Sequence, residues 1–354
     1  MVHSAEDIAH MKRCFELAQN GLGNTYPNPL VGCVIVHEGR IIGEGYHKKC
    51  GEAHAEINAI ASVKDKSLLS QSTLYVNLEP CSHQGRTPAC SLKLIDLKIP
   101  RVVISNKDPY FEVSGRGIEM LKKSGAEVIT GILEKEGAEI NKRFFTFHTK
   151  KRPYIILKWA QTADGFLDKK RTSPKEKPVW ITNEISRSVV HRWRTEENAI
   201  MVGYNTALLD NPALNVREWT GNQPVRIVTD KNLILPANSK LLDGTQKTLV
   251  FTVNPKHPQI KNTEFILADF SKNSVEPILN ELYKRDIQSV IVEGGAKLLN
   301  SFISQNVWDE ARIFTGSLKF TMGVKAPVLP EKMIVNVTEL GGAGLAIYRN
   351  SSNA

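Results

Sequence analysis

The residues with the clearest chemical potential are a histidine, a glutamate and two cysteines within the first 90 positions. They are His54, Glu56, Cys81 and Cys90. One imidazole and two thiolates give a zinc ion three protein ligands and leave its fourth tetrahedral position free for water, which is typical of a catalytic zinc site. Glu56 would supply a base beside that water. The sequence therefore predicts zinc ligands at His54, Cys81 and Cys90, with Glu56 as the catalytic proton carrier.

The order of these residues follows the pattern of zinc-dependent deaminases, a His-x-Glu motif followed by Pro-Cys and a second cysteine. The spacing departs from that pattern, because eight residues, 82–89, separate the cysteines, where the nucleobase deaminases have two. Two alternatives stay open from the residues alone. One is a nucleic-acid base deaminase with an appended binding domain, and the other is a zinc-stapled scaffold without activity.

His54 and Glu56 impose a condition on the helix that carries them. Side chains two positions apart on a regular helix point to different sides. We therefore expect His54 at the N-terminal edge of a helix, where the dihedral angles are not yet helical and both side chains can converge on one ion. The positive end of that helix dipole would then face the thiolates.

The hydrophobic pattern of the first half alternates between helices and strands, which favours an α/β domain with a central sheet. Ser4 and Asp7 indicate the start of a helix that Asn20-Gly21 ends. The pattern then predicts two short strands around a turn at 37–40, a helix from about 53, strands at 73–78, 101–105 and 127–130, and helices at 88–95, 117–123 and 133–147.

Length, charge and cysteine usage limit the class of protein. A chain of 354 residues suggests two domains of about 150 residues each. The N-terminus lacks a signal-peptide core, no apolar run reaches a membrane span, and the five cysteines indicate reduced thiols, so we expect a soluble cytoplasmic protein. The net charge of +9 is scattered and not interleaved with aromatic residues, which disfavours nucleic acid and fits a phosphorylated substrate and cofactor.

A domain boundary is expected where a basic stretch precedes a new strand at 154–160, which gives domains 1–149 and 150–354. The second half lacks the Gly-x-Gly-x-x-Gly fingerprint. A strand at 289–292 nevertheless leads into Gly294, Gly295 and a helix from Ala296, whose backbone N–H groups could receive a pyrophosphate. Lys158 lies within an apolar strand and should face a pocket or a partner. From its residues alone this half is a mixed α/β domain of unknown purpose.

Several motifs resemble one family, the bifunctional riboflavin-biosynthesis deaminase-reductases. The segments 27–32 (Pro-Asn-Pro-Leu-Val-Gly) and 78–90 resemble the deaminase half of that family. Four motifs of the second half occur in the order of its reductase half, at 157–160 with 164–165, at 179–182, at 210–214 with Arg217, and at 292–295. Each of the four is weak alone, but together they are specific, and the resemblance spans nearly the whole chain.

The resemblance implies a cytidine-deaminase-like α/β/α domain followed by a dihydrofolate-reductase-like α/β domain. It implies zinc-dependent hydrolytic deamination of 2,5-diamino-6-(5-phosphoribosylamino)pyrimidin-4(3H)-one to 5-amino-6-(5-phosphoribosylamino)uracil, and then NADPH-dependent reduction of the ribosyl group to a ribityl chain. The expected partners are zinc, NADPH, the small-molecule pyrimidine ribosyl phosphate and further copies of the chain in a homo-oligomer, with no nucleic acid and no membrane.

The resemblance also assigns site residues. Asn28, His83 and Arg86 match positions around the pyrimidine and its ribose phosphate, and His47 is a weaker candidate whose alternative is a surface residue. Positions that line the cofactor in the family correspond to Ala160, Trp180, Thr206, Asp210, Gly295, Ala296, Lys297, Leu298, Leu299, Asn300 and Ser301. Substrate-side positions correspond to Arg194, Leu214, Arg217 and Glu293, and we expect Lys158 to contact substrate or cofactor.

The two arginines suit a ribose phosphate, because a guanidinium can bind two phosphate oxygens at once. The alternative for Arg194 is an exposed helix face that it shares with His191, Arg192 and Glu196. Two features depart from the family, namely Tyr110 in place of the usual asparagine of an Asp-Pro-Asn motif, and a long lysine-rich stretch at 166–178. Substrate contacts from these two places are therefore in doubt.

Overall fold

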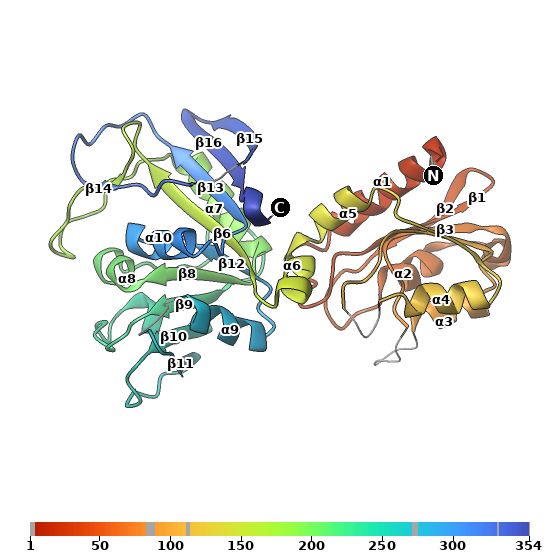
Figure 1. Ribbon diagram of the computed structural model, residues 1–354, viewed down its shortest axis with the longest axis horizontal. Helices are drawn as coiled ribbons and strands as arrows, with labels where there is room; N and C mark the ends of the chain where they lie inside the picture. Colours follow the sequence, from red (N-terminus) through yellow and green to blue (C-terminus); the bar gives the residue numbers. More distant parts are fainter. Residues whose placement is uncertain (1–3, 83–88, 111–113, 271–274, 331–332, 354) are drawn as a thin grey trace. The chain divides into compact units, whose positions relative to one another are not determined.

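The computed structural model describes residues 4–82, 89–110, 114–270, 275–330 and 333–353. The chain divides into two compact units, residues 1–151 and 152–354, close to the boundary expected before Lys150. Both units are of mixed α/β type (Figure 1). Among the described residues, no helix combines the length and the apolar character needed to cross a membrane.

The first unit is a five-stranded sheet between two layers of helices. The sheet order is β2-β1-β3-β4-β5, in which β1 is antiparallel to β2 and β3 while β3, β4 and β5 are parallel. The elements are α1 (Ala5–Gln19), β1 (Gly32–His37), β2 (Arg40–Tyr46), α2 (Ala55–Ser62), η1 (Lys66–Gln71), β3 (Thr73–Leu78), α3 (Cys90–Asp96), β4 (Arg101–Asn106), α4 (Arg116–Lys123), β5 (Glu127–Thr130), α5 (Glu134–Ile140) and α6 (Lys142–Lys150).

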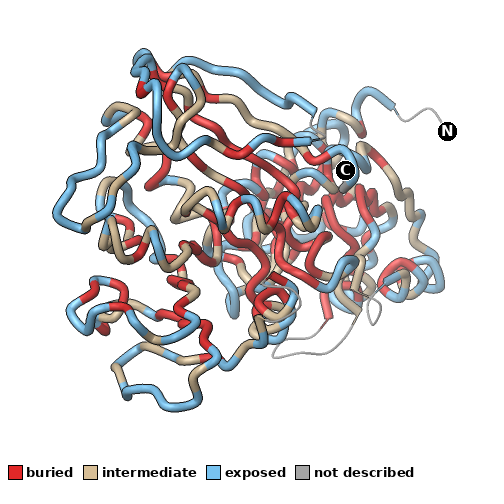
Figure 2. Tube along the Cα trace, turned by 60° about the vertical axis from the view of Figure 1, so that its left-hand side comes forward, coloured by how far each residue is buried: buried red, intermediate tan, exposed pale blue. Residues whose placement is uncertain are grey.

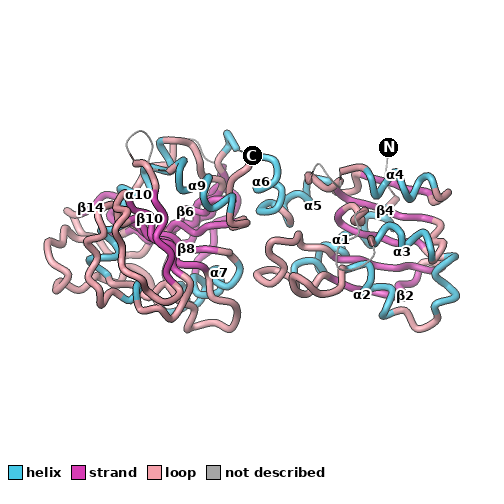
Figure 3. The backbone as a smooth tube through the Cα atoms, turned by 90° about the horizontal axis from the view of Figure 1, so that it is seen from below, coloured by secondary structure: helices cyan, strands magenta, loops and turns pink. Residues whose placement is uncertain are grey.

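Two apolar clusters hold these layers together. Helices α2, α3 and α4 cover one face of the sheet with side chains such as Ala59, Leu94 and Leu121. Helix α1 covers the opposite face with Met11 and Phe15. Buried residues are red in Figure 2, and the strands of the sheet are magenta in Figure 3. The expected α/β pattern of this half is thus present, and it places the ends of β3 and the starts of α2 and α3 together.

The helix expected over 133–147 is instead two helices, α5 and α6, that meet at Asn141. The backbone of Asn141 is not helical, with φ −98° and ψ 21°. Its side chain accepts a hydrogen bond from the N–H of Leu30 at 2.8 Å and donates to the carbonyl of Leu30 at 2.9 Å. A partner so far away in the sequence competes with the helix for this residue, which the local pattern could not show.

The second unit contains a nine-stranded sheet of order β11-β10-β9-β8-β12-β6-β13-β16-β15. The strands from β11 to β13 are parallel, and β16 is antiparallel to both of its neighbours. The strands are β6 (Tyr154–Gln161), β8 (Ala199–Gly203), β9 (Val225–Thr229), β10 (Thr248–Thr252), β11 (Thr263–Leu267), β12 (Ser289–Val292), β13 (Glu310–Thr315), β15 (Met333–Leu340) and β16 (Ala343–Arg349), with β7 (Phe166–Asp168) and β14 (Val324–Lys325) in a separate pair.

Helices cover both faces of this sheet. Helices α9 (Glu276–Lys284) and α10 (Ala296–Ser304) pack their apolar side chains on one face, where Leu282 and Phe302 are buried. On the other face α7 (Glu184–Glu196) contributes Val190 and α8 (Tyr204–Asp210) contributes Ala207. The short turns η2 (Lys240–Leu242) and η3 (Ser351–Asn353) complete the unit. Open parallel sheets of this kind bind ligands at the carboxyl ends of their strands.

Candidate metal centre and charge cluster

The predicted metal ligands come together in the first unit. Nδ1 of His54 lies 3.6 Å from Sγ of Cys81 and 3.4 Å from Sγ of Cys90. All three ligand atoms lie within 4.8 Å of one another, and both cysteines are free thiols. A tetrahedral zinc ion with bonds of about 2.0 Å to nitrogen and 2.3 Å to sulfur separates such ligands by about 3.6 Å. The arrangement therefore fits zinc with three protein ligands.

The helix start satisfies the condition that the sequence imposed. His54 is the N-cap residue of α2 with an extended backbone, φ −70° and ψ 166°, and Glu56 lies in the first turn. Glu56 is 3 % exposed. The expectation that His54 would stand at the edge of the helix, outside the helical dihedral range, is confirmed.

The two cysteine segments are held together by hydrogen bonds outside the spacer between them. The N–H of Cys90 donates to Sγ of Cys81 at 3.2 Å. The carbonyl oxygen of Cys81 accepts from the N–H of Ser91 at 3.1 Å and from its hydroxyl at 3.0 Å. These bonds join the end of β3 to the start of α3, so the eight-residue spacing is compatible with a compact ligand set. His83 and Arg86, which the sequence placed at the substrate, lie outside the described residues.

The titratable groups at this centre are strongly perturbed. Burial raises the pKa of Glu56 to about 7, and the nearby Cys81 adds to this shift. A carboxylate with a pKa near neutrality suits proton transfer, and a bound cation would act in the opposite direction. Hydrogen bonds from Cys90 and His54 lower the pKa of Cys81 to about 4, whereas the pKa of Cys90 is raised. Metal binding would displace the remaining proton.

Asn28 and His47 lie beside the metal ligands. Nε2 of His47 is 3.1 Å from Nδ2 of Asn28, and Nδ1 of His47 is 3.1 Å from the carbonyl oxygen of Ala53. The rings of His47 and His54 meet edge to face, with centroids 5.4 Å apart. His47 is 2 % exposed, and burial lowers its pKa. The interpretation of His47 as a surface residue is therefore wrong.

Glu79 has a role that the sequence pattern did not reveal. Its buried carboxylate accepts hydrogen bonds from four backbone N–H groups, those of Asp108 at 3.3 Å, Gly115 at 2.9 Å, Gly117 at 2.9 Å and Ile118 at 3.3 Å. Three of the four donors lie at the N-terminus of α4, where a negative charge is favourable. Glu79 thus connects the turn that carries Cys81 to α4.

The Tyr110 ring packs on the ring of His148, with centroids 5.3 Å apart.

In the second unit the glycine turn expected to receive a phosphate stands at the carboxyl end of β12. Gly295 has φ 61° and is the N-cap residue of α10. A Cβ on Gly294 would lie 3.0 Å from Val202 and 3.2 Å from Oγ1 of Thr206, and a Cβ on Gly295 would lie 3.1 Å from the same hydroxyl. Close packing against Val202 and Thr206 therefore explains the two glycines.

Lys158, Arg194 and Glu293 form a buried charge cluster at the same edge of the sheet. Arg194 donates to Glu293 at 2.9 Å and 3.3 Å and to the carbonyl of Asn215 at 3.0 Å. The Arg194 and Glu293 side chains are only 11 % and 10 % exposed. The interpretation of Arg194 as part of an exposed helix face is therefore wrong.

The cluster carries one excess positive charge. Burial raises the pKa of Glu293, but Arg194 and Lys158 outweigh burial and hold it at about 2. Burial lowers the pKa of Lys158, while Glu293 opposes that change. Two cations and one anion at this place favour an anionic ligand.

The segment after α8 carries the next pair of predicted residues. Leu214 is buried and has φ 49°, an unfavourable conformation for leucine that the surrounding contacts must hold. The N–H of Arg217 donates to Nδ1 of His191 at 3.2 Å. Burial lowers the pKa of His191 to about 4, so this ring stays neutral and accepts. The Arg217 side chain is 51 % exposed and lies 3.4 Å from the Glu218 carboxylate.

The remaining predicted cofactor residues differ in what they offer. Ala160 is half-buried near the end of β6, and Trp180 is 60 % exposed with the Arg187 guanidinium 5.1 Å from its ring. Asp210 is paired with Arg171 of the lysine-rich stretch. On α10, Ala296 and Leu298 are half-buried, and Lys297 and Asn300 are exposed. Leu299 offers neither its side chain, which is in the core, nor its N–H, which donates to Gly295, and Ser301 bonds to the carbonyl of Lys297.

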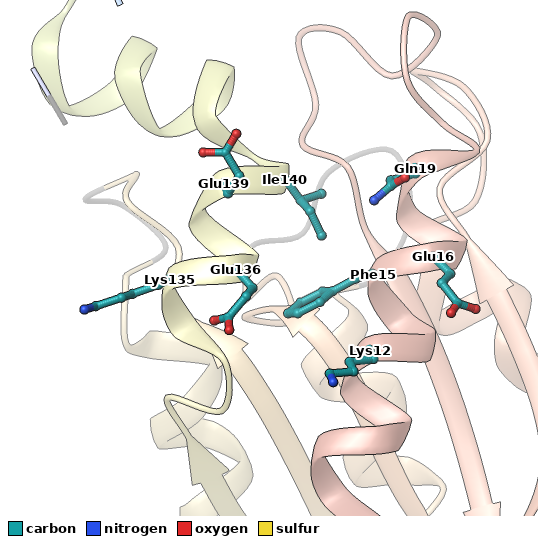
Figure 4. A pocket seen from close by; sticks show the side chains of 8 residues that line it. All are labelled: Lys12, Phe15, Glu16, Gln19, Lys135, Glu136, Glu139 and Ile140. Atoms are coloured by element: carbon teal, nitrogen blue, oxygen red, sulfur yellow. The ribbon is translucent and has the colours of Figure 1, made fainter. Parts of the chain in front are cut away.

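A groove of about 520 Å³ lies apart from both predicted sites. Figure 4 shows it between α1 and α5, with Phe15 and Ile140 facing each other and charged side chains around them. None of its lining residues belongs to the metal centre or was predicted as a site residue.

Comparisons with known proteins agree with this division. Residues 4–106 match the cytidine and deoxycytidylate deaminase zinc-binding region, and residues 153–338 match the RibD C-terminal domain. Riboflavin biosynthesis protein RibD of Aquifex aeolicus is 42% identical over 87% of this chain and 86% of its own, and that of Escherichia coli is 34% identical over 87% of each.

Solved structures show the same likeness over the whole chain. The diaminohydroxyphosphoribosylaminopyrimidine deaminase/5-amino-6-(5-phosphoribosylamino)uracil reductase of Thermotoga maritima superposes with a TM-score of 0.88, at 38% identity over 98% of this chain and 99% of that one. RibD of Acinetobacter baumannii gives a TM-score of 0.87 at 30% identity over 98% and 99%. The expected order of a deaminase-like α/β/α domain and a reductase-like α/β domain is confirmed.

Proposed function

Because the chain belongs to the RibD family of riboflavin biosynthesis enzymes, with a zinc-binding deaminase domain followed by a reductase domain, we propose that it carries out the two reactions named for its Thermotoga maritima relative. The first is deamination of 2,5-diamino-6-(5-phosphoribosylamino)pyrimidin-4(3H)-one to 5-amino-6-(5-phosphoribosylamino)uracil. The second is reduction of the ribosyl group to a ribityl chain. The observation that carries the proposal is the convergence of His54, Cys81 and Cys90 beside the buried Glu56.

In the deamination, the protein groups bind the ion and move protons. His54, Cys81 and Cys90 would hold the zinc ion, which when bound would act as a Lewis acid on a water molecule at neutral pH. Glu56 takes a proton from that water and delivers it to the departing amino group. One proton of the water thus leaves with the amino group as ammonia and the other ends on the adjacent ring nitrogen, so that the amino-bearing carbon becomes a carbonyl and Glu56 returns to its starting state. Asn28 holds the pyrimidine from the side of His47.

In the reduction, we propose NADPH as the nucleotide cofactor, which supplies a hydride when bound. The N–H groups at the start of α10 and the hydroxyl of Thr206 surround the place where a pyrophosphate would lie. Lys158 and Arg217 supply positive charge for the phosphorylated substrate. The Arg194–Glu293 ion pair holds α7 against the end of β12 beside them. The main contribution of this domain is then to align donor and acceptor.

The proposal extends to assembly and location. β15 is the edge strand of the large sheet, and its Met333, Ile334, Val335 and Val337 are 50 % to 66 % exposed. A long apolar edge strand is an aggregation hazard unless it is covered, which supports a homo-oligomer. Thiol ligands that must stay reduced support a cytoplasmic location.

The direct test is an assay of the purified chain with the diaminopyrimidinone phosphate. We expect ammonia release with or without NADPH, and NADPH oxidation that requires the substrate or its deaminated product. NADH in place of NADPH should support much slower oxidation. Ammonia release without any oxidation of NADPH would contradict the reductase half of the proposal, and deamination of single-stranded DNA or RNA instead of the pyrimidine phosphate would favour a nucleic-acid base deaminase.

A further inference from the structure

His47 has two hydrogen-bond partners of different kinds. Its Nδ1 atom lies 3.1 Å from the carbonyl oxygen of Ala53, which can only accept, so Nδ1 carries a proton. Its Nε2 atom lies 3.1 Å from Nδ2 of Asn28. A neutral imidazole that donates from one nitrogen accepts with the other. Nε2 of His47 therefore accepts a hydrogen bond from the amide NH₂ group of Asn28.

That bond determines which way the Asn28 amide faces. If the amide were turned over, its oxygen would oppose Nε2 of His47, and two acceptors would meet. With Nδ2 committed to His47, Oδ1 is the atom that Asn28 turns away from the imidazole. An amide oxygen accepts hydrogen bonds and does not donate them, so the matching group on a ligand must be an N–H or O–H group.

Other hydrogen bonds fix both ends of this connection. The carbonyl of Ala53 also accepts from Nδ2 of Asn58 at 3.1 Å, which ties it to α2. The N–H of His47 donates to the carbonyl of Val31 at 2.9 Å, and the N–H of Asn28 donates to the carbonyl of Thr25 at 2.8 Å. These bonds hold the backbones of both residues in place, and the side-chain bonds of His47 to Ala53 and Asn28 then orient the two side chains before a ligand binds.

We propose that His47 is a positioning residue of the deaminase site, which turns the Asn28 carbonyl toward an N–H group of the pyrimidine. The inference rests on the proposed deaminase function. Because the His47 ring lies edge to face with the His54 ring, 5.4 Å between centroids, a single imidazole separates Asn28 from a metal ligand. A pyrimidine with a donor on that edge is selected, and an analogue with only acceptors there is disfavoured, because the amide oxygen of the half-buried Asn28 would face another acceptor.

Two substitutions of His47 separate its two hydrogen bonds. In His47→Gln the side-chain oxygen can take the place of Nε2 and still accept from Asn28. In His47→Asn the shorter amide can take the place of Nδ1 and keep the bond to Ala53, but it does not reach Asn28. We expect His47→Asn to raise KM for the diaminopyrimidinone phosphate roughly tenfold with kcat changed less than about threefold, and His47→Gln to keep most of the affinity. Each variant gives up one bond, so a purely structural role predicts equal losses in both and would overturn the proposal.

A double-mutant cycle tests whether His47 acts through Asn28. In the Asn28→Ala background, His47→Asn should cause no further rise in KM, whereas a direct contact between His47 and substrate would raise KM again and contradict the positioning role. Zinc content and the thermal midpoint of each variant identify any loss of folding, and calorimetric binding of the substrate to each variant in the Glu56→Gln background gives the same comparison without turnover. Absence of ammonia release from the unchanged chain would overturn the proposed function together with this inference, while ammonia release with additive effects would overturn the inference alone.

Discussion

The metal centre and the charge cluster of Lys158, Arg194 and Glu293 differ in what their polar groups do before any ligand arrives. At the metal centre the pKa of Cys81 is lowered and that of Cys90 is raised, because the two thiols share a proton in a space that three ligand atoms face. In the charge cluster, Arg194 and Glu293 form an ion pair at 2.9 Å, and Lys158 lies beside them. The first site is completed by its ligand, whereas in the second site Arg194 is already paired with Glu293 and only Lys158 is left to attract an anionic ligand.

This difference predicts how each site responds to change. A site that its ligand completes should lose chemistry and stability when the ligand or the one proton carrier is removed, because nothing else satisfies the ligand atoms. A site that is already compensated should keep its shape without ligand, and it should respond mainly to conditions that break the internal pair.

Replacement of the proton carrier is expected to have the largest effect. In Glu56→Gln the amide cannot take a proton from water, so we expect ammonia release to fall about a thousandfold, equivalent to about 4 kcal/mol of transition-state free energy. Metal analysis should find zinc retained, because Glu56 is not among the ligand atoms. NADPH oxidation with 5-amino-6-(5-phosphoribosylamino)uracil serves as the control and should be unchanged. A variant that kept its deaminase rate would exclude Glu56 as the proton carrier and favour a scaffold role for the metal.

Removal of zinc should affect the two domains unequally. Zinc present at about a thousandfold its dissociation constant stabilises the folded state by about 4 kcal/mol, and this contribution belongs to the first domain alone. Differential scanning calorimetry with and without a chelator should therefore show a lower midpoint for the deaminase domain and an unchanged midpoint for the reductase domain. Equal shifts in both transitions, or none in either, would contradict the contrast between the sites.

Low pH should weaken the Arg194–Glu293 ion pair and lower the stability of the second domain. Because the pKa of Glu293 in the folded protein is about 2 and its ordinary value is 4.5, the unfolded chain binds the proton more readily. The stabilisation by Glu293 is therefore complete above about pH 4.5, and it is lost as the pH falls toward 2, by about 3 kcal/mol in total. Urea unfolding of the reductase domain between pH 6 and pH 3 should show about 2 kcal/mol of this loss. The Glu293→Gln variant should be less stable at neutral pH and should show a flatter pH profile over the same range.

The sequence was sufficient for the metal centre because its information is local. Ligand type, ligand number and the neighbouring glutamate can all be recognised within short segments, and the N-terminal position of His54 follows from the geometry of one helix turn. The connection from Ala53 through His47 to Asn28 could not be predicted, since it depends on which nitrogen of His47 faces a carbonyl. The break between α5 and α6 was missed for a similar reason, because Asn141 bonds to Leu30 from 111 positions away.

The residues of the charge cluster could be proposed as site residues mainly through the resemblance to a known family. Lys158, Arg194 and Glu293 come from β6, α7 and the end of β12, and they meet only because β6 and β12 are neighbours in the sheet. No local pattern encodes that neighbourhood. Burial was likewise hidden, since Arg194 and His191 share a helix with charged residues that indicated an exposed face.

The smallest effect expected concerns the hydrogen bonds that hold the cysteine segments before zinc binds. Ser91 is fully buried, and its hydroxyl donates to the carbonyl of Cys81 at 3.0 Å. If this bond keeps Cys81 and Cys90 at metal-binding distance, Ser91→Ala should weaken zinc binding about tenfold, measured by competition with a chromophoric chelator.

The matched control is Ser72→Ala, because the buried Ser72 hydroxyl also donates to a backbone carbonyl, that of Leu68 at 2.7 Å, but away from the ligands. The two substitutions remove the same group and the same kind of bond, so their costs in unfolding free energy should be similar while only Ser91→Ala changes zinc affinity. If both variants bound zinc as tightly as the unchanged chain, the bonds from the N–H groups of Cys90 and Ser91 would be sufficient to organise the centre. The metal centre and the charge cluster would then differ only in the ligand atoms of the metal centre, because the surrounding hydrogen bonds would be equally complete at both sites.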